Sequence, residues 1–544
     1  MSILIRSSAL ALVVSAGWAL PAQASAASDA SDAAIQQELA AMRAEMQAMA
    51  ARIDILEGQL VDARAQAAAA QSKADTASVA VAAIPQQAAV AATATAKPAT
   101  EITWEGAPKL TTSDGWSFKP RGRLHIDAGR ISTPGAYDAT RNLGSNVRLR
   151  RVRLGFEGTM PGGFGYKAEA DFANGSIAVG DFFVSYAPHK STMQVRIGNF
   201  ESLDGLEQIS SSNNNSFLER AAFNDAFINT RRLGAAVAWR SKDYDWRAEL
   251  GAFAAHGLDS SLDNNGWIGA GRLVYAPKAL GGQLHFGLNY QYRRFAENAG
   301  GVASSGIGMP STNQLARYRA RPNSQLTDIR FVDTGNFAAR SDQILGVELA
   351  GIFKRLYVAG EAQWLRANAY SAGDLASGQN SFTAGNTAIV PTGNPGFFGA
   401  YGEVGYFLTG ETRGYKRGDG SWSRTKVLNP ISKGGSGAFQ LAARFEYLDL
   451  ADDSLIAGPT NNFTTGTAGL ASPGSRLGRG GTQTSYLLGL NWYPMDYLRL
   501  MINYVRIEVQ GGPVAALVSP LSTSPINQQD YGVNVLQTRL QFEF

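Results

Sequence analysis

The residues best suited to chemistry in this sequence are arginines that recur on the polar side of alternating segments. Arg121 and Arg123 lie in one such segment. Arg151 and Arg153 lie in the next, with apolar Val152 between them. Rings of Arg or Lys select anions by Coulomb attraction in a narrow, partly desolvated passage. The planar guanidinium also offers phosphate two parallel hydrogen bonds, so this spacing predicts an anion-attracting surface.

The same arginines have a structural alternative. Channel interiors commonly combine Arg with Asp and Glu in ion pairs that hold the wall together, and on this alternative the arginines are structural. Carboxylates suited to such pairing are Glu157, Glu169, Asp171, Glu249, Glu348, Glu361 and Glu446. Composition alone leaves both interpretations open.

A basic segment over 411–436 interrupts the alternating pattern. Its charged residues are Arg413, Lys416, Arg417, Arg424, Lys426 and Lys433 against Glu411 and Asp419. A long basic turn is expected to fold into the pore and narrow it. A solvated hairpin outside the pore is the alternative.

Enzyme chemistry is not expected from this composition. The sequence has no Cys and four His, which excludes a disulfide framework, Cys-ligated zinc and thiol catalysis. His125 and His285 fall on polar faces, but no Ser/His/Asp spacing or metal-ligand cluster accompanies them. We therefore predict no catalytic residues, no metal and no cofactor.

Most of the charged residues named above lie in sixteen segments in which apolar and polar residues alternate. In the last one, Leu536, Leu540 and Phe542 alternate with Gln537 and Arg539. Segments of about 10–13 residues are longer than ordinary strands and cross a bilayer when tilted. Short and long connections alternate between them, as periplasmic turns and extracellular loops do. We expect strands near 119–131, 147–159, 164–173, 178–187, 192–200, 231–241, 245–255, 267–277, 282–294, 341–354, 355–367, 397–410, 437–450, 482–493, 497–509 and 532–544.

The resulting fold class is all-β: a 16-stranded antiparallel transmembrane β-barrel over 116–544, preceded by an α-helical coiled-coil segment. Apolar side chains face outer-membrane lipid and polar side chains face water, and a barrel of this size encloses an aqueous lumen. The sequence therefore predicts a diffusion channel. The excess of positive charge is spread too thinly over the barrel for nucleic-acid binding.

The first 115 residues show three compositional parts. Residues 1–24 combine Arg6, a short apolar stretch and Ala22-Gln23-Ala24, which is typical of a secretory signal peptide. Residues 25–73 carry a heptad seam from Ile35 to Leu60, which predicts a coiled-coil stalk and oligomerisation. An amphipathic helix packed on its own domain is the alternative. Residues 74–115, rich in Ala, Thr and Pro, are interpreted as a linker.

Several stretches resemble the phosphate-selective porin O and P family of Gram-negative outer membranes. They are the Arg-rich run from Arg148 to Glu157, Ile197 to Phe200 followed by Phe217 to Ala221, the segment from Tyr406 to Leu450, Asn491 to Pro494, and Phe544. The resemblance covers about 102–544. It implies a homotrimer of 16-stranded barrels in which an arginine ladder leads to a constriction built by inward-folded loops.

The resemblance also implies that lysines at the constriction bind the anion. Lys416 and Lys426 fall on two of those positions. The loop at 201–230 resembles the one that supplies a third lysine, but here its only cation is Arg220. This departure favours a preference for anions over strict selectivity for phosphate.

The sequence thus predicts an anion-preferring outer-membrane porin, for phosphate or related small anions, with Lys416, Lys426, Arg121, Arg123, Arg151, Arg153 and Arg220 as anion-binding residues. One alternative is a general, non-selective porin with structural arginines. The other is an envelope-tethering protein that uses the barrel as an anchor and makes periplasmic contacts through its coiled coil.

Overall fold

The computed structural model describes Gly58, Ala65 and residues 100–544, apart from 138–141, 176, 228–229, 256, 259–265, 296–314, 371–390, 457–478 and 523. The predicted signal peptide lies outside the described residues. So does the predicted coiled coil, except for Gly58 and Ala65, which are helical. Residues 96–544 form one compact unit.

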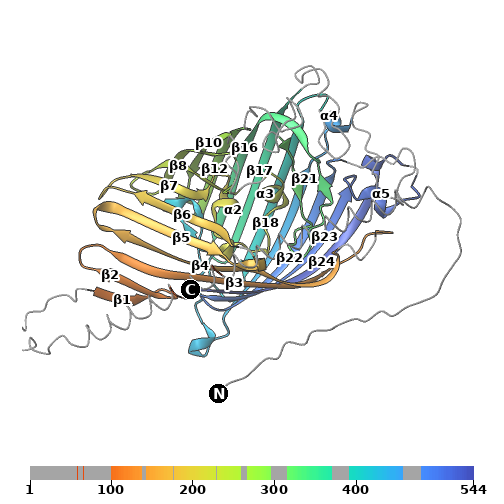
Figure 1. The fold of residues 1–544 in the computed structure, drawn as a ribbon. Coiled ribbons are helices and arrows are strands. Elements are labelled where there is room, and N and C mark those ends of the chain that lie inside the picture. Colours follow the sequence, from red (N-terminus) through yellow and green to blue (C-terminus); the bar gives the residue numbers. More distant parts are fainter. Residues whose placement is uncertain are drawn as a thin grey trace, which may run out of the picture. The chain divides into compact units, whose positions relative to one another are not determined.

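Within the described residues, sixteen strands form a closed antiparallel barrel (Figure 1). Each strand pairs with the next along the chain, and β24 pairs with β3 to close the ring. The strands are β3 (Ser117–Ile131), β4 (Gly144–Met160), β5 (Phe164–Asp171), β6 (Ala178–Tyr186), β7 (Met193–Glu201), β8 (Arg231–Arg240), β9 (Trp246–Ala254), β10 (Trp267–Tyr275), β12 (Gly282–Arg294), β16 (Phe337–Phe353), β17 (Leu356–Ala369), β18 (Gly396–Phe407), β21 (Ala438–Asp449), β22 (Thr482–Met495), β23 (Leu498–Gln510) and β24 (Asp530–Glu543). The predicted strand number and pairing are confirmed.

Side-chain burial in β24 shows which face of the wall is apolar. Leu536 and Phe542 are 54% and 42% exposed on the outer face. Gln537 and Arg539, on the inner face, are 2% and 1% exposed. This is the reverse of a soluble protein, in which apolar groups are buried, and it is the arrangement expected of a barrel surrounded by lipid.

No helix in the described part of the chain is long and apolar enough to span a membrane.

A hairpin precedes the barrel in residues that the sequence analysis assigned to the end of the linker. Its strands are β1 (Thr100–Trp104) and β2 (Pro108–Thr112), and β2 joins β3 through Leu110 and Thr111. Gly106 takes a positive φ of 86° in the connecting turn, a conformation that glycine adopts without strain. Two five-residue strands are too short to show a clear period within an Ala/Thr-rich composition.

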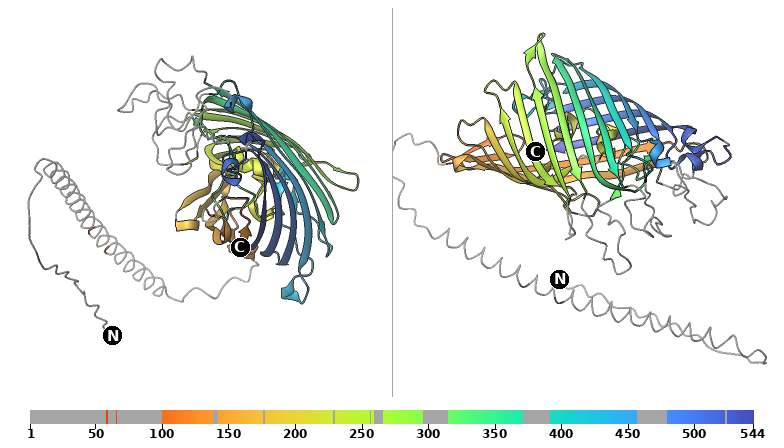
Figure 2. Two further views of the ribbon diagram at one scale, coloured as in Figure 1. Left: turned by 90° about the vertical axis from the view of Figure 1, so that its right-hand side faces the viewer. Right: turned by 90° about the horizontal axis from the view of Figure 1, so that it is seen from above.

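The two ends of the barrel differ in the length of their connections. At one end, neighbouring strands join through short turns such as Pro161–Gly163 and Lys354-Arg355, with the long connection between β18 and β21 (408–437) as the exception. The connections at the other end are mostly longer. Figure 2 shows the strands from two further directions, with short helices enclosed by the wall. The remaining elements are η1 (Pro161–Gly163), η2 (Ala173–Gly175), α2 (Leu206–Ile209), η3 (Ser212–Asn214), α3 (Ala222–Ala226), β11 (Lys278–Ala279), β13 (Leu315–Ala316), β14 (Arg319–Ala320), β15 (Val332–Asp333), β19 (Tyr415–Lys416), η6 (Arg417–Asp419), β20 (Ser421–Trp422), η7 (Ile431–Lys433), α4 (Asp453–Ile456), α5 (Ala515–Val518) and η9 (Ile526–Gln528).

Candidate anion pathway in the barrel lumen

A β-bulge in β4 concentrates arginines on the inner face of the wall. His125 of β3 pairs with Arg151, but the next residue, Ile126, pairs with Leu149, so that Arg150 is an extra residue. A bulge of this kind places two successive side chains on one side of a sheet. Arg150 and Arg151 consequently both reach the lumen, and Leu149 remains exposed on the outer face.

The segment between β7 and β8, residues 202–230, crosses the interior and is called the inner loop here. The backbone N–H groups of Leu206 and Glu207 donate to the carboxylate of Glu361 on β17, each at 2.8 Å. On a different part of the wall, the backbone N–H of Leu218 donates to Oδ1 of Asn503 on β23, also at 2.8 Å. Two separate parts of the barrel wall therefore hold the inner loop in place.

Arg220 braces the inner loop internally. Its Nε donates to the carbonyl of Glu207 at 3.0 Å, and its Nη2 donates to the carbonyls of Gln208 and Ser210 at 3.1 and 2.9 Å. These three carbonyls belong to α2 and to the residue that follows it. Arg220 thus carries a positive charge that carbonyl dipoles stabilise without neutralising it.

Residues 413–424 of the basic turn fold into the barrel and meet the inner loop, whereas 426–436 are largely exposed. The backbone N–H of Trp422 donates to Oγ of Ser210 at 2.8 Å, and Nδ2 of Asn214 donates to the carbonyl of Trp422 at 3.2 Å. Arg272, on the wall, donates to the carbonyl of Gly420 at 2.7 Å. Two connections from different parts of the chain therefore narrow the lumen together.

The first of two polar cavities, called the Arg151 cavity, has a volume of about 220 Å³. It lies between the bulged part of β4 and the inner loop. Six basic side chains and two acidic ones line it: Arg150, Arg151, Arg153, Arg220, Arg231 and Arg321 against Glu219 and Asp225. This imbalance makes the cavity electropositive.

Arg151 differs from its neighbours in lacking a counter-charge. It is only 7% exposed, and no hydrogen bond or salt bridge joins it to another described residue. Arg150 pairs with Glu219 at 2.9 Å, and Arg153 pairs with Glu169 and Asp171, both at 2.8 Å. A buried charge without a partner is costly. An anion in the cavity would supply the missing charge.

Glu219 on the inner loop contributes a negative charge to this region. Burial raises the pKa of its carboxyl group, but the guanidinium groups of Arg150 and Arg539 outweigh that effect and hold the pKa well below its usual range. Glu219 is therefore ionised at any physiological pH. It neutralises Arg150, to which it is bonded, and leaves Arg151 as the uncompensated group.

The second cavity, called the Arg196 cavity, has a volume of about 410 Å³ and reaches the basic turn. Its charged lining residues are Arg121, Arg123, Lys167, Arg196, Arg231, Arg247, Lys416 and Arg424 against Asp181, Glu201, Glu249, Asp419 and Glu543. Eight basic groups thus face five acidic ones. Basic groups therefore outnumber acidic ones here as well, but by a smaller ratio than in the Arg151 cavity.

Arg196 and Arg123 supply much of the uncompensated charge in the Arg196 cavity. The Arg196 guanidinium stacks on Phe183 and Phe200, 5.0 and 4.9 Å from the ring centroids, and forms no salt bridge with a described residue. Arg123 donates to the hydroxyl groups of Ser212 and Ser211, and the nearest oxygen of Glu169 is 3.9 Å away. Arg196 is held by groups that do not cancel its charge, and Arg123 is offset only in part by the more distant carboxylate of Glu169.

Arg231 lines both cavities and so connects them. Its Nε lies 2.6 Å from Oδ1 of Asp181, and its Nη1 lies 2.8 Å from Oε1 of Glu201. Arg231 is not among the residues that the sequence predicts to bind anions. Its position in the sequence could have indicated this role, because Arg231 is the first residue of β8 after the inward-folded loop. A wall residue at that position lies next to the lumen.

The structure separates the residues predicted to bind anions into two groups. Arg151, Arg153 and Arg220 line the Arg151 cavity. Arg121, Arg123 and Lys416 line the Arg196 cavity, although Arg121 pairs with Glu157. Lys426 is exposed and belongs to neither lining.

Lys416 lies at the solvent side of the Arg196 cavity. Its side chain is 66% exposed, and its Nζ is 2.5 Å from Oδ2 of Asp419. Burial raises the pKa of Asp419, but the neighbouring Lys416 ammonium outweighs this effect, so the pKa lies below its usual value. The pair is therefore ionised, and the exposed ammonium retains room for a second anionic partner.

The two histidines on the inner face of the wall have structural partners. Nε2 of His125 is 3.0 Å from Oδ1 of Asn213 on the inner loop. His285 contacts Glu348 at 3.0 Å and the hydroxyl of Tyr415 at 2.6 Å. No group of three or more Asp, Glu or His residues arranged to hold a metal ion occurs among the residues that the structure describes.

Comparison with known proteins places the chain in a family. The family described as phosphate-selective porin O and P matches residues 118–544. An uncharacterised protein of Caulobacter vibrioides is 32% identical over 526 residues, which cover 94% of this chain and 90% of that protein. Porin O of Pseudomonas aeruginosa is 24% identical over 422 residues, which cover 74% of this chain and 85% of the relative.

Solved structures similar to this one include two named channels. The anion-selective porin from Comamonas acidovorans has a TM-score of 0.44 and 11% identity, with coverage of 79% of this chain and 100% of that one. The outer membrane channel DcaP of Acinetobacter baumannii has a TM-score of 0.43 and 12% identity, with coverage of 80% and 99%. The family assignment rests on the sequence match, which spans the whole barrel: the chain belongs to the phosphate-selective porin O and P family of outer-membrane channels.

Proposed function

We propose that this porin is a water-filled, anion-preferring diffusion channel in the outer membrane of a Gram-negative bacterium, and that phosphate or related small anions pass through it. The observation that carries the proposal is Arg151, a buried guanidinium that has no carboxylate partner in the described structure. It lies in a cavity with six basic and two acidic side chains. Guanidinium groups bind phosphate through paired, charge-assisted hydrogen bonds.

The proposed route runs from the Arg151 cavity past Arg231 into the Arg196 cavity. Arg153 and Arg220 accompany Arg151 in the first cavity, and Arg121 and Arg123 lie in the second. The paired arginines contribute less to selectivity than the unpaired ones, because their carboxylate partners screen them from a passing ion. Selectivity is therefore assigned mainly to three groups: Arg123, Arg151 and Arg196.

The two lysines of the basic turn are assigned different roles. Lys416 contacts an anion directly, since its ammonium lines the Arg196 cavity. Lys426, which is exposed and outside both linings, attracts anions toward the turn through its long-range field. The two roles are separable because salt screens a long-range field more strongly than a contact.

Assembly and export are proposed from the sequence. The heptad seam within residues 25–73 fits a homotrimer whose coiled coil makes periplasmic contacts, and residues 1–24 fit a signal peptide. Cross-linking of the mature, full-length protein in membranes tests the trimer. A ladder that stops at three chains supports it, and a monomer under all conditions contradicts it.

Planar bilayer recording tests the channel. In a KCl gradient, the reversal potential should show that Cl⁻ is more permeant than K⁺, and added phosphate should reduce the Cl⁻ current. A reversal potential near zero without phosphate block would instead support the general porin. Protein that inserts but conducts no current would support the envelope-tethering alternative.

A further inference from the structure

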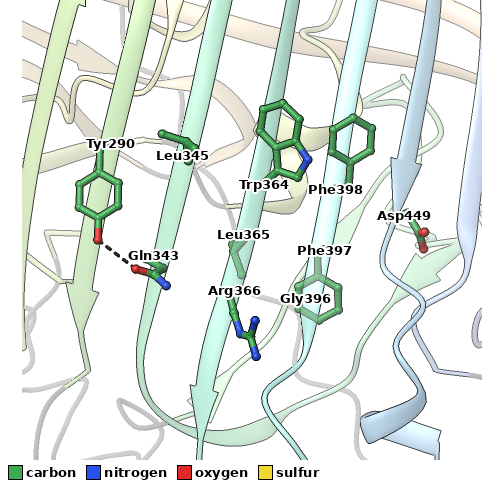
Figure 3. Close-up of a pocket in the computed structure, with 10 residues that line it drawn as sticks. All are labelled: Tyr290, Gln343, Leu345, Trp364, Leu365, Arg366, Gly396, Phe397, Phe398 and Asp449. Atoms are coloured by element: carbon green, nitrogen blue, oxygen red, sulfur yellow. Dashed lines mark hydrogen bonds between the residues drawn. The ribbon is translucent and has the colours of Figure 1, made fainter.

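The outer face of the barrel carries a groove of about 530 Å³ that the channel function does not use. It runs across β12, β16, β17, β18 and β21, and apolar side chains form most of its wall (Figure 3). Trp364 is 46% exposed there, and Leu345 and Phe398 lie beside it. The full lining is Tyr290, Gln343, Leu345, Trp364, Leu365, Arg366, Gly396, Phe397, Phe398 and Asp449.

Arg366 gives this groove a charged end. Its side chain is exposed, and Figure 3 shows it toward the loop end of β17, beyond the ring of Trp364. In the sheet, Arg366 pairs with Gln343 on β16 and with Gly396 on β18. Gln343 places a polar side chain on one side of Arg366, and Gly396 has no side chain on the other. No hydrogen bond or salt bridge joins the Arg366 side chain to another described residue.

Further charged residues lie near the loop ends of the neighbouring strands, and Arg294 and Arg340 both have partners of their own. Arg294 of β12 and Arg340 of β16 are also exposed near the loop end of their strands. Asp449 lies across the groove, where its Oδ1 accepts the backbone N–H of Ala451 at 2.9 Å, and it forms no salt bridge with Arg366. Among the residues that line the groove, Arg366 is the basic residue and Asp449 the acidic one, and the two do not form an ion pair.

A cation on the lipid-facing side of a barrel is unfavourable in the hydrocarbon core and acceptable near the interface. The depth of Arg366 in the membrane follows from the orientation of the barrel. Short turns mark the periplasmic end of such barrels and long loops the extracellular end, and Arg366 lies near the long connection between β17 and β18. It thus stands at the head-group level of the extracellular leaflet, where a basic side chain attracts anionic head groups.

A second outer groove provides an internal comparison. It measures about 460 Å³ and is lined by residues of β18, β21, β22 and β23, among them Tyr406, Leu441 and Leu488. No charged residue lines it. An apolar surface alone suits any acyl chain. Of these two grooves, only the one with Arg366 combines an acyl-chain surface with a site for a negative group.

We propose that the Arg366 groove binds a lipid of the extracellular leaflet whose phosphate groups give its head group a net negative charge. Arg366 contacts the lipid phosphate, and an acyl chain lies against Leu345, Trp364 and Phe398. Inorganic phosphate shares the anionic group but has no acyl chain, so it should not occupy this groove.

Native mass spectrometry of the detergent-solubilised full-length protein tests this site. Diphosphoryl lipid A should remain bound at collision energies that remove phosphatidylcholine, and millimolar inorganic phosphate should not displace it. Arg366→Gln should weaken retention of lipid A about fivefold, the effect expected of one basic side chain near a head group. Phosphatidylcholine binding should be unchanged.

Arg506→Gln is the matched control. Arg506 lies on the outer face near the loop end of β23, outside the groove, and its Nε is 3.8 Å from Glu508. This variant should retain lipid A as the unmodified protein does. Equal retention by Arg366→Gln, or equal retention of phosphatidylcholine and lipid A by the unmodified protein, would overturn the proposal. Single-channel conductance is a separate readout, because Arg366 is outside the lumen and its substitution should leave anion selectivity unchanged.

Discussion

Arg150 and Arg151 are neighbours in β4, and both side chains lie on the inner face because the strand bulges at Arg150. One of them is neutralised by Glu219, and the other has no counter-charge in the described structure. The bulge thus brings Arg150 to the inner face, whereas strict alternation with Arg151 and Arg153 would have turned it toward lipid. Because Glu219 pairs with Arg150, Arg151 keeps its positive charge uncompensated.

Arg151→Gln should reduce anion preference. The change removes the uncompensated charge of the Arg151 cavity, and charge-assisted hydrogen bonds are worth about 1.5–3 kcal/mol, so phosphate block should weaken about tenfold. The reversal potential in a KCl gradient should move toward zero. The double variant Arg247→Gln/Glu249→Gln is the control, because it removes an ion pair of the Arg196 cavity and keeps the net charge. If both variants change selectivity equally, the assignment to Arg151 is wrong.

Lys416→Gln and Lys426→Gln should have different effects on phosphate block. The first removes a contact, so block should weaken about fivefold or more at low and at high salt. The second removes only a long-range attraction, and its effect should disappear in 1 M KCl, where the Debye length is about 3 Å. Block curves at 0.1 M and 1 M KCl distinguish the two. A salt-independent loss in Lys426→Gln would show that this lysine contacts the anion.

Arg220→Ala should loosen the inner loop without unfolding the barrel. Three carbonyls would lose their donor, each at a cost of about 1–3 kcal/mol where they stay buried. Single-channel records should become noisier, with frequent changes of conductance, whereas the heat-resistant migration of the folded barrel on gels should persist. Quiet records identical to those of the unmodified channel would contradict the bracing role.

Asp204 should make the stability of the inner loop depend on pH. Burial raises the pKa of its carboxyl group to about 7, against the opposing effect of the Ser202 hydroxyl that donates to it at 2.6 Å. Since the unfolded value is about 3.9, the folded protein binds more protons than the unfolded one between pH 4 and 7. The stability therefore falls as pH rises through this window, by at most about 1.4 kcal/mol per pH unit for one proton.

Asp204→Asn tests this dependence. Free energies of unfolding measured in bilayers at pH 4.5, 5.5 and 6.5 should decline for the unmodified protein relative to the variant, in which the group cannot ionise. Parallel pH profiles for the two proteins would show that Asp204 titrates in its ordinary range.

The barrel could be predicted from the sequence because its pattern is long and redundant. Sixteen segments repeat the same alternation, and an error in one boundary does not affect the others. Residues such as Leu536 and Arg539 could be assigned to opposite faces from parity alone. The hairpin formed by β1 and β2 escaped prediction because ten residues do not establish a period.

The site was less predictable because it depends on departures from periodicity. The bulge at Arg150 shifts the alternation of inward and outward side chains in β4. In the sequence, the only indication of this bulge is that two arginines, Arg150 and Arg151, are adjacent. In the irregular turn that holds Lys416 and Lys426, no period tells which side chain faces a cavity. Whether Arg151 or Arg153 carries a free charge depends on carboxylates of other segments, such as Glu169 and Asp171, whose positions only the fold determines.

The seam between β24 and β3 has a consequence for how the protein is made. Nε and Nη2 of Arg539 donate hydrogen bonds to the two carboxylate oxygens of Asp127, at 2.6 and 2.7 Å. The two residues are 412 positions apart in the sequence. A contact of such long range forms late, after many local pairings have been made. The ring cannot close before β24 has been synthesised, so any part of the sheet that forms earlier has two open edges and needs protection from aggregation.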